Sequence, residues 1–542
     1  MSLVPDELAR DPERLLQQLR ELAQVVAQQD ASIASLQAER DTVLAEREAA
    51  QSEIEKLKLL IRQLQRGQFG RRSERLDPDQ LQLGLEDLEQ TMAAAAQDAA
   101  TARSSVPRPC RVRRRNLGAL PTHLPRVEVL VDVADKSCPC CGGALHVLGE
   151  SREEMLDIVP AQLRVKVIRR PRYGCRACEG AVVQAPVPER PITGGMASEA
   201  LLAQVLVNKH ADFLPLYRQA QIFARQGVEL DRSTLADWVG RACWWLEPLW
   251  RLLRRHVMSS TRIFADDTPL PVLDPGRGRT KTGRLWVYAV DDRPWQGDAP
   301  PAVVFLYAED RKGERPAAHL AEFQGVLQVD GYSGFKRLLE DRPAGEIRLA
   351  FCWAHCRRRF YEIHQATGSP LAEEALRRIG ELYRIEAEIR GRPAGERCAA
   401  RQERSRPIVD GLHGWLGAQL ERVSARSSLA EALRYALRHW DGLVLFLDDG
   451  RLELDTNTVE RTIRPIALGR RNALFAGSDG GARHWAIVAS LVASAKLNGV
   501  EPLAWLTDVL ERMVSGRTKA HELEQLLPWS WKAERLAAAV NP

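Results

Sequence analysis

RIFADDTPLPVL (262–273) opens a series of five strand-like segments near the middle of this 542-residue sequence. It is rich in β-branched and apolar residues and carries two adjacent aspartates, Asp266 and Asp267. Four similar runs follow it: GRLWVYAVDD (283–292), AVVFLYAED (302–310), GVLQVDGY (325–332) and EIRLAFCWAH (346–355). Because turn residues separate these runs, we predict that they pair as strands of a β-sheet.

Helical patterns flank the strand-like region. Before it come three amphipathic segments: MASEALLAQVLVNKHA (196–211), LPLYRQAQIFARQG (214–227) and DRSTLADWVGRACWWL (231–246). The last two are joined by a short turn with Gly227, which suits a helix-turn-helix that reads DNA, although any small helical bundle shows the same pattern. After the strands, residues 357–451 are rich in Arg, Glu, Ala and Leu and predict a long helical stretch.

Residues 13–66 predict a coiled coil. With Ile33 at position a, twelve of the fifteen a and d positions are apolar, and Gln29, Arg40 and Arg47 weaken the middle. We expect this helix to join two copies of the chain as a homodimer or higher oligomer. The alternative is a long helix that folds back on its own chain.

Arginine is concentrated in two clusters around a Pro- and Gly-broken linker. The net charge of +5 is too small to indicate nucleic-acid binding by itself, but only 11 of the 77 basic residues are lysines. Guanidinium groups bind phosphate in a bidentate way, so both clusters are candidate DNA contacts, with a solvated basic face as the alternative. The residues concerned are Arg71, Arg72, Arg111, Arg113, Arg114 and Arg115.

Two C-x-x-C pairs lie 33 residues apart and predict a zinc ribbon over residues 127–190. Four thiolates suit one tetrahedral structural zinc, and Cys140 is an alternative to Cys141 as a ligand. Such a site contributes folding energy, and the arginines before it suggest DNA contact, with a purely structural clip as the alternative. The expected ligands are Cys138, Cys141, Cys175 and Cys178.

Cysteine usage and hydropathy also bear on the compartment. No signal peptide and no run of 18 apolar residues is evident, so we expect no membrane association. Ten cysteines in a chain of this length fit metal binding in a reducing compartment better than disulfides. We therefore expect a cytoplasmic protein.

Three carboxylates have the order along the chain in which a ribonuclease-H-like fold supplies its metal ligands. Asp266 lies on the first predicted strand, Asp330 ends the fourth, and Glu460 opens a later helical segment. Magnesium prefers hard oxygen ligands, and two ions can activate the attacking oxygen and stabilise the leaving oxygen of a phosphodiester. The spacing alone is a weak signal, because the chain has 72 acidic residues.

Several strings resemble the DDE transposases of the IS-sixty-six insertion-sequence family. They are FGRRSER (69–75), ADDTP (265–269), KTGRLWVYAVDD (281–292), VDGYSGF (329–335), CWAHCRRRF (352–360) and NTVERTIRPIALGRRNALFAGS (457–478), together with the cysteine pairs and the predicted coiled coil. The resemblance covers nearly the whole chain in the family's order. It implies a transposase with a ribonuclease-H-like core, small accessory proteins of the same element, and a bacterial, nucleoid-associated location.

The resemblance also implies the site. Asp266, Asp330 and Glu460 match the family's catalytic triad and would hold two magnesium or manganese ions. The family usually has Glu where this chain has Asp267, which leaves open which of the two neighbours binds metal. Adjacent strand residues point to opposite faces, so only one of the pair should face the site. We favour Asp266 as the ligand, with Asp267 as a supporting or turn acid.

His355 and Cys352 form a C-x-x-H motif directly after the fifth strand. Several transposase families resemble this, with the histidine near the scissile phosphate, so we predict a positioning or proton-relay role for His355. The alternative is a buried pair that packs helix against sheet. Cys356 adds a metal possibility, but three soft ligands within five residues make poor tetrahedral geometry.

Four arginines follow Glu460 closely and are candidate contacts to the DNA backbone. Arg461 can equally pair with an acid of the core. The four are Arg461, Arg464, Arg470 and Arg471.

Together these features predict a multidomain α+β protein whose partner is double-stranded DNA, both the element's ends and its target. The alternatives are a DNA-binding regulator without catalysis and a magnesium-dependent nuclease without strand transfer. The predicted parts are a coiled coil (13–66), a basic linker (67–126), a zinc ribbon (127–190), a helical DNA-binding region (191–257), the α/β catalytic core (258–356), a helical insertion (357–451), the second part of the core (452–480) and a helical C-terminal region (481–542).

Overall fold

The computed structural model describes Gln29 and residues 163–174, 182–274, 276–340, 342–343 and 345–540. The chain divides into two compact units, 1–109 and 110–542, and every helix and strand below belongs to the second. The predicted coiled coil, apart from Gln29, the basic linker and all four expected zinc ligands lie outside the described residues.

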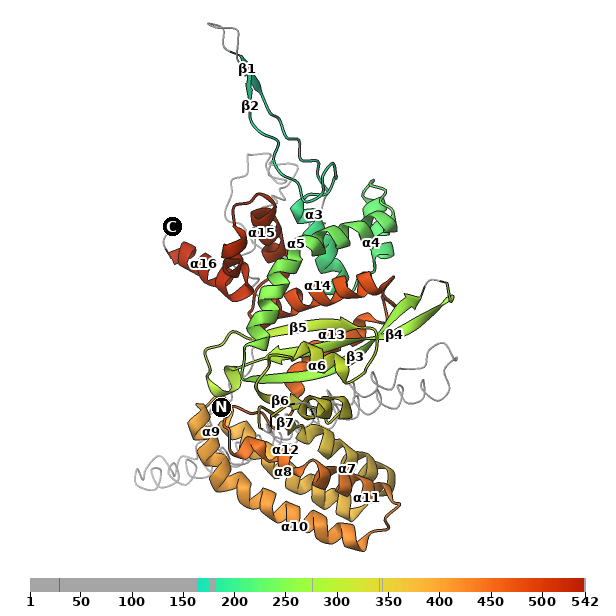
Figure 1. Ribbon diagram of the computed structural model, residues 1–542, viewed down its shortest axis with the longest axis vertical. Coiled ribbons are helices and arrows are strands. Elements are labelled where there is room, and N and C mark those ends of the chain that lie inside the picture. The colour runs from blue at the N-terminus through green and yellow to red at the C-terminus, as the bar shows by residue number, and fades with distance from the viewer. Residues whose placement is uncertain are drawn as a thin grey trace, which may run out of the picture. The chain divides into compact units, whose positions relative to one another are not determined.

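All five predicted strands of the central region are confirmed, and they form one sheet in the order β5-β4-β3-β6-β7 (Figure 1). In this sheet β4 pairs antiparallel with both β3 and β5, whereas β6 and β7 run parallel to β3. The strands are β3 (Arg262–Asp274), β4 (Arg279–Val290), β5 (Ala302–Ala308), β6 (Gly325–Val329) and β7 (Ile347–Phe351).

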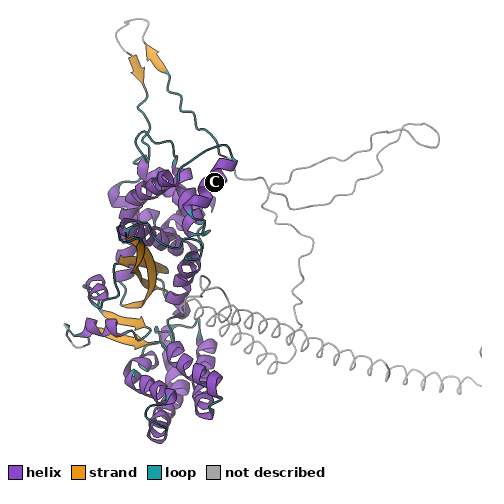
Figure 2. Ribbon diagram, turned by 90° about the vertical axis from the view of Figure 1, so that its right-hand side faces the viewer, coloured by secondary structure: helices purple, strands orange, loops and turns teal. Residues whose placement is uncertain are grey.

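Helices account for most of the remaining described chain, and Figure 2 shows the strands of the sheet between two groups of helices. Their bounds are α3 (Glu199–His210), α4 (Leu216–Arg225), α5 (Arg232–Met258), α6 (Glu314–His319), α7 (Trp353–Thr367), α8 (Pro370–Ile389), α9 (Ala394–Ala400), α10 (Arg406–Arg422), α11 (Ser428–Arg438), α12 (Trp440–Leu443), α13 (Asn457–Gly469), α14 (Asp479–Leu497), α15 (Pro502–Val514) and α16 (Pro528–Val540).

The two faces of the sheet are covered by different helices because strand side chains alternate between faces. Phe264 and Val287 point to the face where Val459 and Ile463 of α13 complete an apolar core, together with part of α14. Ala265 belongs instead to the larger core on the opposite face, to which α3, α5 and α15 contribute. Neighbouring residues of β3 therefore lie in different environments.

α5 is longer than its sequence pattern predicts. The pattern indicates an end at residue 246, and this boundary is wrong, because the helix continues through Pro248 to Met258. Leu249, Leu253 and Val257 extend its apolar stripe, and each is fully buried. α4 and α5 keep the connectivity of a helix-turn-helix, but the long C-terminal half of α5 packs on the sheet side of the core.

The helices between β7 and α13 form a group with its own apolar core, in agreement with the helical pattern of residues 357–451. Trp353 and Phe360 of α7 lie at the centre of this core, and neither is exposed to solvent. Val326 of β6 and Ala350 of β7 also belong to it. The insertion therefore packs directly on the β6–β7 edge of the sheet (Figure 1).

Two arginines inside the insertion are fully buried and paired. Arg401 donates to both carboxylate oxygens of Glu386, each at 2.7 Å. Arg397 donates to Glu453 Oε1 at 2.7 Å, and Arg390 donates to Glu453 Oε2 at 2.6 Å. Because Glu453 lies on the segment that returns from these helices to α13, we call these five residues the return clamp.

A two-stranded antiparallel hairpin precedes α3. β1 (Arg172–Gly174) pairs with β2 (Val182–Gln184), and the predicted zinc ligands Cys175 and Cys178 lie in the undescribed stretch between them. Among the described residues, no helix combines the length and apolarity that a membrane crossing requires.

We expect the removal of one arginine from the return clamp to destabilise the protein strongly. Arg397→Met leaves a buried carboxylate with one fewer partner, so the free energy of unfolding should fall by about 3–5 kcal/mol. Arg404→Met is the matched control, since the side chains of the Arg404–Glu388 pair in the same insertion are 42% and 51% exposed. This change should lower the free energy of unfolding by only about 0–1 kcal/mol. Thermal and denaturant unfolding measure both; equal losses would contradict the prediction.

Candidate active site

The pairing register brings Asp266 and Asp330 to the same level of the sheet, on adjacent strands. Phe264 of β3 pairs with Gln328 of β6, and the two strands are parallel. Asp266 lies two residues after Phe264, and Asp330 lies two residues after Gln328. Both aspartates are therefore at the same level and on the face to which Phe264 and Gln328 point. Asp266 lies within β3, and Asp330 is the first residue after β6, so two adjacent strands supply the first two acids.

The loop after β6 fixes the position of Asp330. Its Oδ1 accepts a hydrogen bond from the Tyr332 backbone N–H at 2.8 Å, and its carbonyl accepts one from the Tyr435 hydroxyl at 2.9 Å. Gly331 between them has φ +100°, and a Cβ there would lie 2.6 Å from the Tyr435 hydroxyl oxygen. This position of the VDGY string therefore requires glycine.

Asp266 lies in a strongly negative environment. Burial raises the pKa of its carboxyl well above the ordinary value, and the charges of Asp330, Asp267 and Glu460 raise it further. The backbone N–H of Asp267, which donates to Asp266 Oδ1 at 2.7 Å, opposes the shift. The three acids of the predicted triad therefore act on one another electrostatically.

Asp267 points to the opposite face and has cationic partners. Arg284 donates to its Oδ2 at 3.0 Å and Arg311 to its Oδ1 at 2.9 Å, and its side chain is 1% exposed. Burial still raises the pKa of Asp267, although both arginines lower it. With its oxygens occupied by two guanidinium groups, Asp267 has the surroundings of a structural acid.

Glu460 reaches this region through residues 452–456, which dock on the sheet and α7. The side-chain amide of Gln328 accepts from the Glu453 backbone N–H and donates to its carbonyl, at 3.3 and 2.9 Å. The Trp353 backbone N–H donates to the Leu454 carbonyl at 3.0 Å. Thr456 then donates its hydroxyl to Glu460 Oε1 at 3.1 Å. The segment fixes Glu460 relative to the strand of Asp330.

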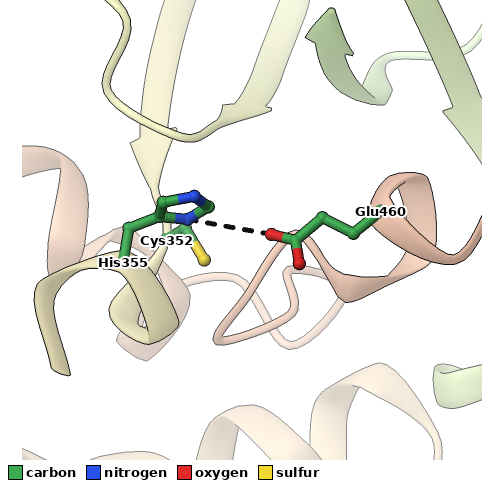
Figure 3. A group of neighbouring side chains, drawn as sticks. All are labelled: Cys352, His355 and Glu460. Atoms are coloured by element: carbon green, nitrogen blue, oxygen red, sulfur yellow. Dashed lines mark ion pairs between the residues drawn. The ribbon is translucent and has the colours of Figure 1, made fainter. Parts of the chain in front are cut away.

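Cys352, His355 and Glu460 converge beside this segment (Figure 3). His355 Nδ1 lies 3.8 Å from Glu460 Oε1. Cys352 is buried, and its Sγ accepts the Thr456 backbone N–H at 3.3 Å. Within the described chain, this is the only trio of potential metal ligands with donor atoms all within 4.8 Å of one another.

The carboxylate triad fits hard divalent cations. Asp266, Asp330 and Glu460 offer oxygen ligands whose mutual repulsion raises the pKa of Asp266, and a cation among them would remove that repulsion. Their donor atoms do not form a trio as tight as that around His355.

The four arginines near α13 have different surroundings. Arg461 is exposed, and its charge lowers the pKa of Asp455. Arg464 and Arg471 each interact with neighbouring groups of the protein. Arg470 is 7% exposed and donates to the Pro269 carbonyl at 2.6 Å, an arrangement that ties α13 to β3. This burial favours a structural role for Arg470 over the predicted contact with DNA.

One acid of this region was not singled out from the sequence. Burial raises the pKa of the Asp455 carboxyl to about 7, and the charges of Glu453 and Glu460 raise it in the same direction. Asp455 accepts the backbone N–H and the side-chain amide of Asn457, at 3.1 and 2.8 Å. The sequence offered one signal for Asp455: it lies just before the start of a helix, five residues before Glu460.

Four family models match the chain, in order along it. They are described as "Transposase C of IS166 homeodomain" (residues 56–129), "zinc-finger binding domain of transposase IS66" (135–179), "Transposase IS66 family" (194–484) and "IS66 C-terminal element" (490–529). The second of these supports zinc binding by the segment that contains all four expected cysteine ligands.

Relatives of similar length occur in Sinorhizobium fredii (strain NBRC 101917 / NGR234). "Uncharacterized protein y4jD" is 49% identical over 494 residues, which are 90% of this chain and 95% of that protein. "Uncharacterized protein y4qI" is 40% identical over 544 residues, covering 99% of this chain and 100% of that protein. The similarity therefore extends across all the parts described above.

The electrostatics of Asp266 predict a stability effect that can be measured without DNA. Because its pKa is raised above 3.8 on folding, its contribution to stability is complete below pH 3.8 and is lost as pH rises through the folded pKa. Asp266→Asn cannot ionise, so in EDTA at pH 7 it should melt at a higher temperature than the wild type.

The exposed Asp298→Asn is the control and should leave the melting temperature unchanged. The difference between Asp266→Asn and wild type should shrink as pH falls toward 4. A lower melting temperature of Asp266→Asn at pH 7 would show that Asp266 is not in a repulsive cluster.

Proposed function

The chain belongs to the IS66 transposase family, and from this premise we propose that it is a DDE transposase that cleaves DNA at the ends of its element and joins them to a target. Asp266, Asp330 and Glu460 would hold two magnesium or manganese ions. The observation that carries the proposal is the register of β3 and β6, which sets two acids at one level, together with the third acid on α13.

A ribonuclease-H-like core is part of this proposal. The sheet order β5-β4-β3-β6-β7, with one antiparallel half and one parallel half, supports it. So does the origin of the three acids: the first strand, the end of the fourth, and a helix after the fifth. In this fold the helices between β7 and α13 are an insertion into the core.

The chemistry would be phosphoryl transfer without a covalent protein intermediate. Bound magnesium would supply charge neutralisation and activation of the attacking oxygen. The protein's share is positioning: the Asp330 loop is held by Tyr332 and Tyr435, and Glu460 by Thr456. The 3.8 Å contact of His355 with Glu460 supports a positioning or proton-relay role for the histidine.

DNA would contact several parts of the chain. The zinc-finger segment, the α4–α5 pair and the arginine clusters at 69–75 and 107–115 would bind the terminal repeats. Arg461, Arg464 and Arg471 beside α13 would contact the DNA backbone near the carboxylates. Two chains would associate through the coiled coil at 13–66, and accessory proteins of the same element would complete the assembly.

The proposal predicts a separation of binding and cleavage. Asp330→Asn should retain binding to labelled duplex carrying the element's end, yet lower magnesium-dependent cleavage by at least about 1000-fold, since one lost metal ligand removes several kcal/mol of transition-state stabilisation. Gel shift and strand-cleavage assays, with and without EDTA, measure the two quantities. Asp298→Asn is the control and should cleave normally.

Cleavage by Asp330→Asn at the wild-type rate would overturn the carboxylate site. Joined products would establish strand transfer, whereas nicking alone would indicate a nuclease. Specific binding by the wild type without any cleavage, even with the accessory proteins added, would favour a DNA-binding regulator.

A further inference from the structure

Three donor atoms of different chemistry meet where α7 and α13 begin (Figure 3). Cys352 directly precedes α7, His355 lies in its first turn, and Glu460 lies in the first turn of α13. The thiol, imidazole and carboxylate atoms lie within 4.8 Å of one another. These are the three ligand types that zinc accepts from proteins.

The surroundings of Cys352 suit a thiolate bound to a cation. The backbone N–H of Thr456 donates to Sγ at 3.3 Å, and a backbone N–H of His355 also donates to it. Metal-bound ligands typically have outer partners of this kind, which orient them. In the absence of a cation, burial raises the pKa of the Cys352 thiol, and the charges of Glu460 and Asp455 raise it further. A bound cation would oppose both effects.

His355 has an unsatisfied nitrogen that faces the same point. Its Nδ1 is buried and has no hydrogen-bond partner, although it lies 3.8 Å from Glu460 Oε1. When the ring proton is on Nε2, Nδ1 is an acceptor facing an acceptor. A cation between the two atoms, or a second proton on the ring, makes this contact favourable.

The distance between His355 Nδ1 and Glu460 Oε1 needs little change to fit zinc. Nitrogen and oxygen ligands of one tetrahedral zinc lie about 3.4 Å apart, given bonds of about 2.0–2.1 Å, against 3.8 Å here. The sequence alone offers Cys356 as the third ligand, too close along the helix for good geometry. Glu460 replaces it from a separate element, which removes this objection and leaves a fourth position open.

We propose that Cys352, His355 and Glu460 bind a zinc ion that withdraws Glu460 from Asp266 and Asp330 and so inhibits strand cleavage. The Cys352 thiol proton is released to solvent as the thiolate binds. The inhibition rests on the proposed function, whereas the binding does not. Magnesium would not compete for Cys352, because it prefers oxygen ligands.

The binding is tested on the full chain purified with zinc in its zinc-finger segment. Cobalt(II), titrated as a zinc substitute, should produce a thiolate-to-cobalt absorption band in the wild type. Cys352→Ser, which keeps a hydrogen-bond acceptor at the start of α7, should lose the band. Cys356→Ser is the matched control: it is equally buried, one turn later in α7, and outside the trio, so it should keep the band.

A second variant tests the binding independently, in case Cys352→Ser misfolds. His355→Gln should weaken cobalt binding at least about tenfold while circular dichroism and melting temperature stay near the wild type. An equal band in wild type, Cys352→Ser and His355→Gln would assign all cobalt to the zinc-finger cysteines and overturn the proposal. Loss of the band in Cys356→Ser alone would also overturn it.

The inhibition is tested by titrating zinc into the magnesium-dependent cleavage assay. Half-inhibition should require at least about tenfold more zinc in Cys352→Ser than in wild type and Cys356→Ser, each normalised to its own uninhibited rate. Equal zinc sensitivity of all three would overturn the inhibitory role. If no chain cleaves DNA, the proposed function fails, while the cobalt band still decides whether the zinc site exists.

Discussion

The docking of residues 452–456 is the constraint on which the candidate site depends. Glu460 lies 130 residues after Asp330 in the chain. The chain must therefore return from the long insertion to a defined position beside the sheet. Gln328 holds both backbone polar groups of Glu453, and it lies on β6 two residues before Asp330. The positions of the second and third acids are thereby coupled through one buried amide.

The return clamp extends this coupling into the insertion. The side chain of Glu453 binds Arg397 and Arg390, and the carbonyl of Leu452 accepts a hydrogen bond from Arg401 at 2.8 Å. Buried ion pairs often contribute little net stability, but removing one partner leaves a charge that is expensive to bury. These contacts hold residues 452 and 453 against the helices of the insertion. The insertion therefore helps to position Glu460.

The sequence predicted the strands well, because β-branched runs between turn residues are a local signal. Alternation along β3 also separated Asp266 from Asp267, and the two arginines on Asp267 agree with that assignment. The arrangement of Cys352, His355 and Glu460 was not predictable from spacing, since it depends on how the insertion returns. The burial of Arg470 is likewise a tertiary effect, because the carbonyl of Pro269 that it binds lies 201 residues away.

Glu460 belongs to both candidate metal sites, which differ in their other ligands. On one side lie the carboxylates of Asp266 and Asp330, which offer only oxygen, and on the other lie a thiol and an imidazole. Hard magnesium and borderline zinc prefer opposite sides, so the ion that is present determines which neighbours the glutamate joins. Glu460 Oε1 accepts the Thr456 hydroxyl at 3.1 Å and lies 3.8 Å from His355 Nδ1. The residue that completes the proposed catalytic site is therefore also the one through which the proposed zinc ion would inhibit it.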